Sequence, residues 1–120
     1  MRQTALNVAS SSWSTGAWRA RAAAHYSKRD YKSAIADLNL AVGLNHRDGI
    51  ALYNRGLAYR ANGEPDRAVI DFDTAIKINS SSEAYYYRGL SRRDLRDYDK
   101  EIEDFNQAIR LDSKKSFMFV

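Results

Sequence analysis

The sequence predicts an all-α fold in which antiparallel pairs of helices stack into a solenoid. The segment 51–81 is repeated 33 positions later as 84–114, and a fixed period of this kind is typical of repeat proteins. Within each copy, apolar residues recur at the three- and four-residue intervals of an amphipathic helix. The chain of 120 residues has one proline and six glycines, so long loops are not expected. Each copy is therefore predicted to be two helices joined by a short turn.

Three such units account for most of the chain. A third copy lies upstream in 17–45, 34 positions before the middle copy. The units are predicted at 15–48, 49–81 and 82–115. Breaks within units are predicted at 28–30, 62–64 and 95–97, and breaks between units near 45–48 and 79–82. Pro65 directly follows a break and starts a second helix, a position that tolerates proline because first-turn amides have no helical acceptor.

This helix-turn-helix pattern resembles the tetratricopeptide repeat family over residues 15–115. The resemblance rests on a large residue at unit position 4, a small one at 8, a large apolar one at 24 and alanine at 27. The matching residues are, in that order, Trp18, Leu52 and Tyr85; Ala22, Gly56 and Gly89; Leu38, Phe72 and Phe105; and Ala41, Ala75 and Ala108. The resemblance implies a right-handed superhelix that acts in protein–protein interaction and not as an enzyme.

The third unit departs from the family pattern at two positions that should be packed. Glu101 stands where the pattern has alanine, and Arg92 stands where it has tyrosine. A lone buried carboxylate is costly. We therefore predict that Arg92 and Glu101 face each other across the helix pair.

Arginine and aspartate recur with the period of the units. The arginines, on the first helices, are Arg21, Arg55 and Arg88, and the aspartates, on the second helices, are Asp37, Asp71 and Asp104. A guanidinium group can bind a carboxylate through two parallel hydrogen bonds, so each arginine can meet an aspartate of its own or of an adjacent unit. These six charges could form a ligand site, but we interpret them as a structural ladder that sets the register of the stacked units.

The resemblance also implies a concave groove, lined by the first helices, that binds a peptide or a partner helix. The predicted groove residues are Arg19, Tyr26, Tyr53, Asn54, Leu57, Arg60, Tyr86, Tyr87, Leu90 and Arg93. Tyrosine and arginine are enriched in protein interfaces, which favours a ligand-facing role. The alternative is that Tyr53 and Tyr86 only pack against neighbouring helices.

Some family members hold the C-terminal carboxylate of a chaperone with lysines, an arginine and asparagines on this surface. Only Asn54 and Arg19 fit that pattern here. Ala23, Glu83 and Tyr87 occupy the other places, so a chaperone tail is not the expected ligand.

Other classes of function find little support. His25 and His46 are isolated in the sequence, residues 10–12 lack a glycine elbow, and no glycine-rich phosphate loop is present, so no catalytic site, metal or cofactor is expected. Residues 1–29 carry a charge of +5 and residues 30–120 a charge of −1, which argues against a basic face for nucleic acid. Without an apolar run of about 18 residues or a secretory signal, we expect a soluble cytoplasmic protein that binds no membrane.

The two ends allow several interpretations. Residues 1–14 are either an N-terminal arm or a cap in which Trp13 covers the first helix pair, and a transit peptide is a further alternative. Residues 116–120 form an apolar C-terminal tail. It is expected to fold onto the last helix, to enter a groove of another copy and so form a homo-oligomer, or to be covered by the next unit of a longer array. The alternative function is thus a self-associating structural module filled by its own tail.

Overall fold

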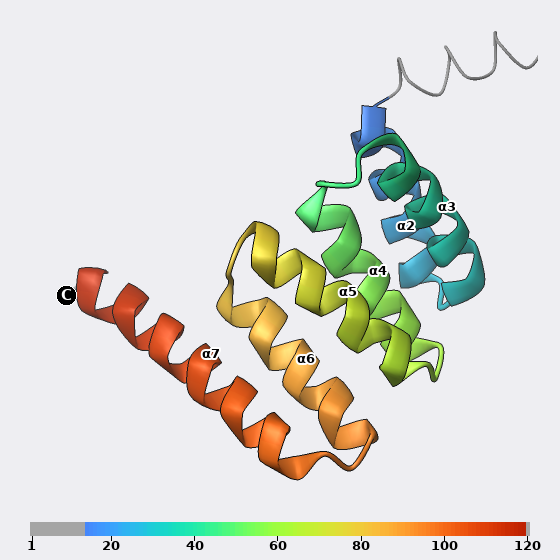
Figure 1. Ribbon diagram of the computed structural model, residues 1–120. Coiled ribbons are helices and arrows are strands. Elements are labelled where there is room, and N and C mark those ends of the chain that lie inside the picture. Colours follow the sequence, from blue (N-terminus) through green and yellow to red (C-terminus); the bar gives the residue numbers. More distant parts are fainter. Residues whose placement is uncertain (1–13, 120) are drawn as a thin grey trace, which may run out of the picture.

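The computed structural model describes the backbone of residues 14–119 and the side chains of residues 15–113. This part of the chain forms six helices and no strand, which confirms the predicted all-α class. The helices are α2 (Ser14–Ser27), α3 (Tyr31–Leu44), α4 (Gly49–Ala61), α5 (Pro65–Ile78), α6 (Ser82–Asp94) and α7 (Tyr98–Phe119) (Figure 1). They begin and end close to the breaks predicted from the sequence.

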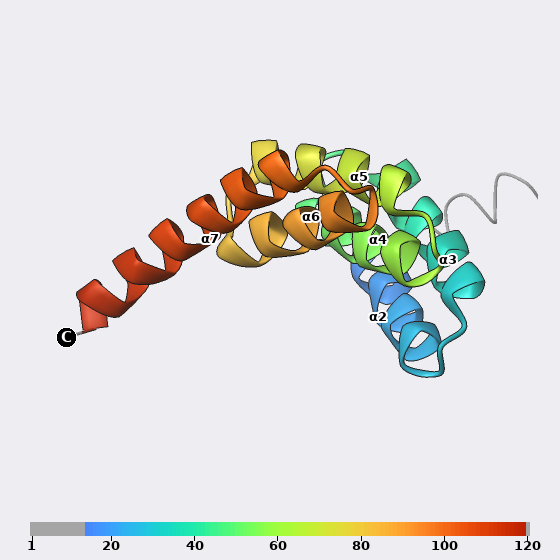
Figure 2. The same ribbon diagram turned by 90° about the horizontal axis from the view of Figure 1, so that it is seen from below.

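Consecutive helices pack as three antiparallel pairs, α2 with α3, α4 with α5 and α6 with α7. Each second helix also packs against the first helix of the next pair, α3 against α4 and α5 against α6. Figure 2 shows the result as an arch, with α2, α4 and α6 on the inner side and α3, α5 and α7 on the outer side. The molecule measures 53 × 34 × 24 Å, an elongated shape that is expected when each unit contacts only its neighbours.

Polar side chains mark the helix starts. Asp30, Asp48 and Ser81 precede α3, α4 and α6, and each accepts a hydrogen bond from the backbone amide three residues later. The fourth start differs, because α5 has no side-chain cap and instead begins at Pro65. That proline occupies the position predicted for it.

The turns inside the three units share one backbone geometry. Arg29, Gly63 and Arg96 stand at equivalent positions and have φ values of 64°, 79° and 62°. This left-handed conformation suits glycine and is strained for other residues. Two of the three units therefore tolerate strain at the point where the chain reverses.

The core consists of large residues set among alanines. Phe72 and Leu38 are the largest apolar side chains that are fully buried. The buried alanines of α3, α4 and α5 are Ala34, Ala41, Ala51, Ala58, Ala68 and Ala75. Small side chains at these positions let neighbouring helix backbones approach closely. Close packing between the helices therefore stabilises each pair, in addition to the burial of apolar surface.

The last helix is longer than its partner and extends beyond it (Figures 1 and 2). No proline or glycine lies between Tyr98 and Phe119 to end the helix. Residues 116–119 of the predicted tail therefore continue α7, so the tail does not fold back onto the last helix as one of the three alternatives expected. Val120 and the arm or cap predicted for residues 1–14, apart from the Ser14 backbone, lie outside the described residues. None of the described helices has the length and apolar character to cross a membrane.

Candidate functional site

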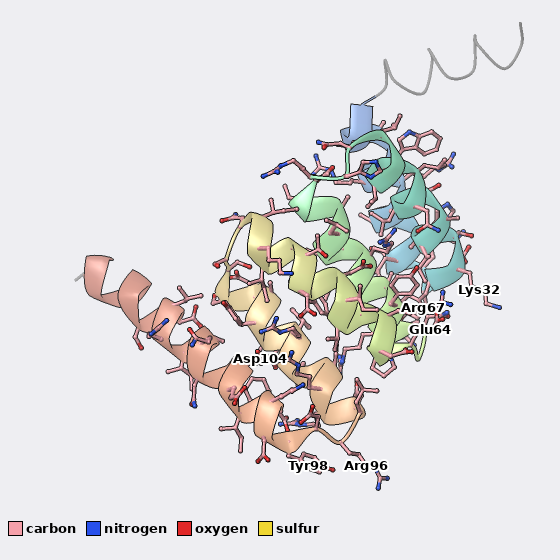
Figure 3. The ribbon with its side chains drawn as sticks, viewed as in Figure 1. Lys32, Glu64, Arg67, Arg96, Tyr98 and Asp104 are labelled. Carbon is pink, nitrogen blue, oxygen red and sulfur yellow. The ribbon has the colours of Figure 1, made fainter. Side chains whose placement is uncertain are left out.

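Each arginine of the ladder binds the aspartate of its own unit. The pairs are Arg21 with Asp37, Arg55 with Asp71 and Arg88 with Asp104, at N–O distances of 2.7–3.2 Å. In every pair Nε and Nη2 both donate to the carboxylate, and the aspartate side chain is at most 5% exposed. The hydrogen bond to Asp71 raises the pKa of Arg55, so the guanidinium stays charged. Asp104 points from α7 toward α6 (Figure 3).

Two of these arginines also reach the preceding unit. Nη1 of Arg55 donates to Asn39 at 3.0 Å, and Nη1 of Arg88 donates to Asp73 at 2.7 Å. Arg21 belongs to the first unit and has a side chain that is 60% exposed, against 19% for Arg55 and 15% for Arg88. The sequence left open whether the partner is in the same or an adjacent unit. In all three pairs the repeated aspartate belongs to the same unit as its arginine. In the second and third units the arginine also binds another residue, Asn39 or Asp73 of the preceding unit, so one side chain connects the two helices of a unit and connects that unit to its neighbour.

The predicted pairing of Arg92 with Glu101 is wrong. Glu101 is buried, as expected, but it binds Arg93. Nη1 of Arg92 instead donates to Asp104 at 2.9 Å, beside the guanidinium of Arg88.

The helix faces explain the exchange of partners. Gly89 lies against Phe105, since a Cβ atom at residue 89 would stand 2.8 Å from the ring. Arg93 follows Gly89 by one helical turn, and Glu101 precedes Phe105 by one turn, so these two side chains meet along the same line of contact.

Every arginine predicted to line the groove has a carboxylate partner in the chain. The pairs are Arg19 with Asp48 at 3.3 Å, Arg60 with Asp94 at 2.9 Å, and Arg93 with Glu101. The Arg19 pair joins α2 to the start of α4, and the Arg60 pair joins α4 to the end of α6. The positive charge of the predicted groove is therefore balanced within the protein.

Three of the predicted groove tyrosines are joined by edge contacts, one of which connects two units. The ring centroids of Tyr53 and Tyr87 are 6.1 Å apart, and those of Tyr86 and Tyr87 are 5.1 Å apart. Tyr53 also contacts Phe72 of the core at 5.8 Å. Burial raises the pKa of Tyr53 to about 12 and also raises the pKa of Tyr26. Tyr53 thus packs against its neighbours, as the alternative interpretation has it, and also lines a cavity at the start of α4.

A small cavity of about 180 Å³ lies between α2 and α4. It is lined by Ala22, Ala23, Tyr26, Ser27, Ala34, Leu38, Asn54 and Leu57. Three of the ten predicted groove residues, Tyr26, Asn54 and Leu57, meet here. The lining is largely apolar, so the cavity suits an apolar side chain.

A larger and more open cavity of about 550 Å³ lies where α4 and α6 begin. Of the predicted groove residues, Arg19 and Tyr53 line it, together with Asn45, Arg47 and Asp48 from the turn between the first two units. The sequence analysis did not single out these turn residues. The available signal for their role was their position directly before the first helix of a unit, because the cavity lies at that end of the helix.

The five remaining predicted groove residues are in the lining of neither cavity. Arg60 lies on α4, and the other four, on α6, are Tyr86, Tyr87, Leu90 and Arg93. Tyr86 is 46% exposed and contacts Phe105 at 5.7 Å, whereas Leu90 is half-buried. The two cavities thus take in five of the six predicted groove residues of the first two units and none of those of the third.

Among the described residues, no group of three or more histidine, cysteine, aspartate or glutamate side chains is placed to hold a metal ion. His25 is less isolated than its sequence indicates. Its ring nitrogens lie 3.7 Å from Asp30 and 3.7 Å from Asp37. This places it beside the first rung of the ladder.

The sequence model described as "Tetratricopeptide repeat" matches residues 19–83 and 53–116. Among solved structures, MamA is 28% identical with a TM-score of 0.82, and the match covers 86% of this chain and 61% of that chain. The Sgt2 TPR domain from Aspergillus fumigatus is 26% identical with a TM-score of 0.79, covering 82% of this chain and 66% of that one. The chain therefore spans less than two thirds of the length of either structure.

A third structure is the second TPR of Spaghetti (RPAP3) bound to the HSP90 peptide SRMEEVD. It is 22% identical, with a TM-score of 0.78, and the match covers 81% of this chain and 91% of that chain. This likeness concerns the fold alone. No curated protein matches the sequence.

Proposed function

The chain belongs to the tetratricopeptide repeat family, and we propose that it is a protein-interaction module whose concave groove binds a peptide or a partner helix through apolar and aromatic contacts. The observation that carries the proposal is the cavity between α2 and α4. It is apolar, lies between the first helices of two units, and has Tyr26 and Asn54 in its lining. An apolar side chain of the ligand would enter it, while these two polar groups hold the ligand backbone.

The charges of the groove favour an apolar ligand over an acidic one. An acidic peptide would have to compete with Asp48, Asp94 and Glu101 for the groove arginines. Breaking such a pair leaves a carboxylate without its partner, which costs more than the new contact returns when that carboxylate is buried, as Asp48 and Glu101 are. The acidic peptide SRMEEVD that the RPAP3 domain binds is therefore not the ligand class we propose for this chain.

The tyrosines supply the rest of the contact surface. Tyr26 and Tyr86 are 38% and 46% exposed, and Tyr87 is half-buried between the Tyr53 and Tyr86 rings. A tyrosine ring offers a large apolar area at low entropic cost because it has few rotatable bonds, and its hydroxyl group can bind a peptide backbone. The row runs from α2 to α6, so a ligand that follows it crosses all three units.

The test selects peptides from a random phage-displayed library on the full chain and measures their affinity by isothermal titration calorimetry. Ala23 is exposed and lines the cavity, so Ala23→Trp would fill the cavity with a ring. The matched control is Ala36→Trp, at an exposed alanine of α3 on the outer side. We expect Ala23→Trp to weaken binding at least about tenfold, or about 1.4 kcal/mol, and Ala36→Trp to leave it unchanged.

Selected peptides should carry an aliphatic or aromatic anchor. The proposal fails if the library yields mainly acidic peptides, or if the selected peptides bind the Ala23→Trp variant as tightly as the unchanged chain. Circular dichroism of both variants checks that a loss of binding is not a loss of helix.

A further inference from the structure

One interface occurs twice within the chain, each time between the second helix of a unit and the first helix of the next. Ile35 and Val42 of α3 pack against a cluster that includes Ala51 and Ala58 of α4. At the centre of this interface Arg55 donates to Asn39. The contact thus combines two aliphatic side chains and an acceptor on one side with two small residues and an arginine on the other.

The second interface repeats this set at equivalent positions. The α5 side has Val69, Asp73 and Ile76, and the α6 side has Ala84, Arg88 and Ser91. Arg88 donates to Asp73 as Arg55 does to Asn39. Ala84 and Ser91 are 1% and 0% exposed, so the small residues are again covered.

Helix α7 presents the aliphatic half of the interface with no described helix against it. Ile102 and Ile109 are 33 positions after Val69 and Ile76, and their exposed fractions are 58% and 63%. Asn106, which is exposed, stands at the acceptor position between them. The three side chains form the surface that we call the α7 face.

Helix α2 presents the other half. Ala17, Arg21 and Ala24 precede Ala51, Arg55 and Ala58 by 34 positions. Ala24 is exposed where Ala58 is fully buried, and the Arg21 side chain is 60% exposed. Arg21 uses Nε and Nη2 on Asp37, and its Nη1 has no hydrogen-bond acceptor in the described part of the chain. These three side chains form the α2 face.

We infer that the α2 face of one copy docks on the α7 face of a second copy, head to tail, with Nη1 of Arg21 donating to Asn106. The occupant is a second copy because the chain already forms this interface twice, and the two halves that no described helix covers are complementary to each other. Ile102 and Ile109 would pack over Ala17 and Ala24, as Ile35 and Val42 pack over Ala51 and Ala58. The contact is heterologous, so each added copy offers a new α7 face to the next copy. The inner side of the arch takes no part, so this inference does not depend on the proposed function.

Sedimentation equilibrium of the full chain over a series of concentrations tests the inference. The weight-average mass should rise with concentration beyond twice the monomer mass of 13.7 kDa. Ile109→Glu blocks the α7 face, and Ala24→Glu blocks the α2 face. Each variant alone should stay monomeric at concentrations where the unchanged chain associates. Ile70→Glu is the control, since Ile70 is 64% exposed on α5 and belongs to neither face.

The mixture of the two variants distinguishes head-to-tail docking from other modes. Ile109→Glu keeps an intact α2 face and Ala24→Glu keeps an intact α7 face, so an equimolar mixture should form a dimer and nothing larger. A symmetric contact between two α7 helices would instead leave Ala24→Glu dimeric by itself and the mixture without a new species, which would overturn the inference. A chain that stays monomeric at every concentration would overturn it as well. Helical circular dichroism of each variant confirms that the unit is folded.

Discussion

Gly56 lies directly against the ring of Phe72, so that a Cβ atom at residue 56 would stand 2.7 Å from Cε1 of that ring. Gly89 and Phe105 repeat the arrangement at 2.8 Å in the third unit. In the first unit the equivalent residues are Ala22 and Leu38, which belong to one core cluster. Glycine thus faces phenylalanine in the second and third units, and alanine faces the smaller leucine in the first. The volumes of the two residues are therefore matched within each unit.

Gly56→Ala should therefore lower the free energy of unfolding by about 1–3 kcal/mol, because Phe72 is fully buried and cannot move aside. Urea denaturation followed by circular dichroism measures the change. The control is Gly43→Ala on α3, where nothing lies within 4 Å of the added atom. That substitution should stabilise the chain by up to about 1 kcal/mol through helix propensity alone. A loss of stability in both variants would contradict the packing explanation.

The double substitution Gly56→Ala with Phe72→Leu recreates the residue pair of the first unit. Its loss of stability should be smaller than the sum of the two single losses by about 0.5–3 kcal/mol, because leucine leaves the space that the new methyl group needs. Strict additivity in the same urea experiment would mean that the two positions do not constrain each other.

An arginine–aspartate pair of the ladder should contribute more to the free energy of unfolding where its arginine is shielded from solvent. Arg55→Ala should destabilise the chain by about 3–5 kcal/mol, since it leaves the buried Asp71 without its partner and also removes the bond to Asn39. Arg21→Ala should cost clearly less, because that side chain is mostly exposed and, within the described residues, its hydrogen bonds go to Asp37. Chemical denaturation of both variants gives the comparison. Equal losses, or a loss below about 0.5 kcal/mol for Arg55→Ala, would place the ladder among exposed ion pairs.

The fold and the ladder could be predicted because each of their features occurs three times. Arg21, Arg55 and Arg88 have the same spacing as the aspartates that they bind. Residues that recur once per unit lie at the same place in every unit. When the units stack, these residues line up and make the same contact in each unit. The small residue at Gly56 was predictable for the same reason, whereas the helix start at Pro65 was predictable from the preference of proline for the first turn of a helix.

Contacts that occur once were not predictable. Arg60 binds Asp94 in the next unit, whereas the equivalent Arg93 binds Glu101 in its own unit. Repetition carries no information about such differences, because the choice depends on which carboxylate lies within reach of one long side chain. One signal for the Arg60–Asp94 pair was available in the sequence. The two residues carry opposite charges and lie about one repeat apart on the first helices of neighbouring units.

Arg93→Ala should cost more stability than Arg92→Ala, although Arg93 is the more exposed of the two. The first substitution leaves the buried Glu101 without a partner and should cost about 1–3 kcal/mol. The second leaves Asp104 still bound by Arg88. Glu101→Ala added to Arg93→Ala should recover most of the loss, because it restores the alanine that the first two units have. Thermal unfolding ranks the variants, and the reverse order would show that Arg92 is the main partner.

The turn between α6 and α7 offers a stabilising substitution. Arg96 has a φ of 62° and points away from the molecule (Figure 3). Gly63, at the equivalent position of the second unit, has a φ of 79° without strain. Arg96→Gly should therefore raise the free energy of unfolding by about 1 kcal/mol. Lys100→Gly, at an exposed position inside α7, should lower it by a similar amount. A loss at both sites would mean that the turn is not strained.

Tyr53 should make the stability of the chain depend on pH in the alkaline range. Its pKa is about 12 in the folded protein, mainly because of burial, against an ordinary value of 10.0 in the unfolded chain. Between these two values the unfolded state has released the proton and the folded state still holds it. Unfolding is therefore favoured increasingly as the pH rises from 10 to 12, and the contribution of the neutral hydroxyl group is fully present only below pH 10. Tyr53→Phe has no proton to release, so its free energy of unfolding should fall less over this range than that of the unchanged chain. Tyr98→Phe, at an exposed tyrosine of α7, should keep the original slope, and a Tyr53→Phe slope equal to that of the unchanged chain would show that Tyr53 titrates alike in both states.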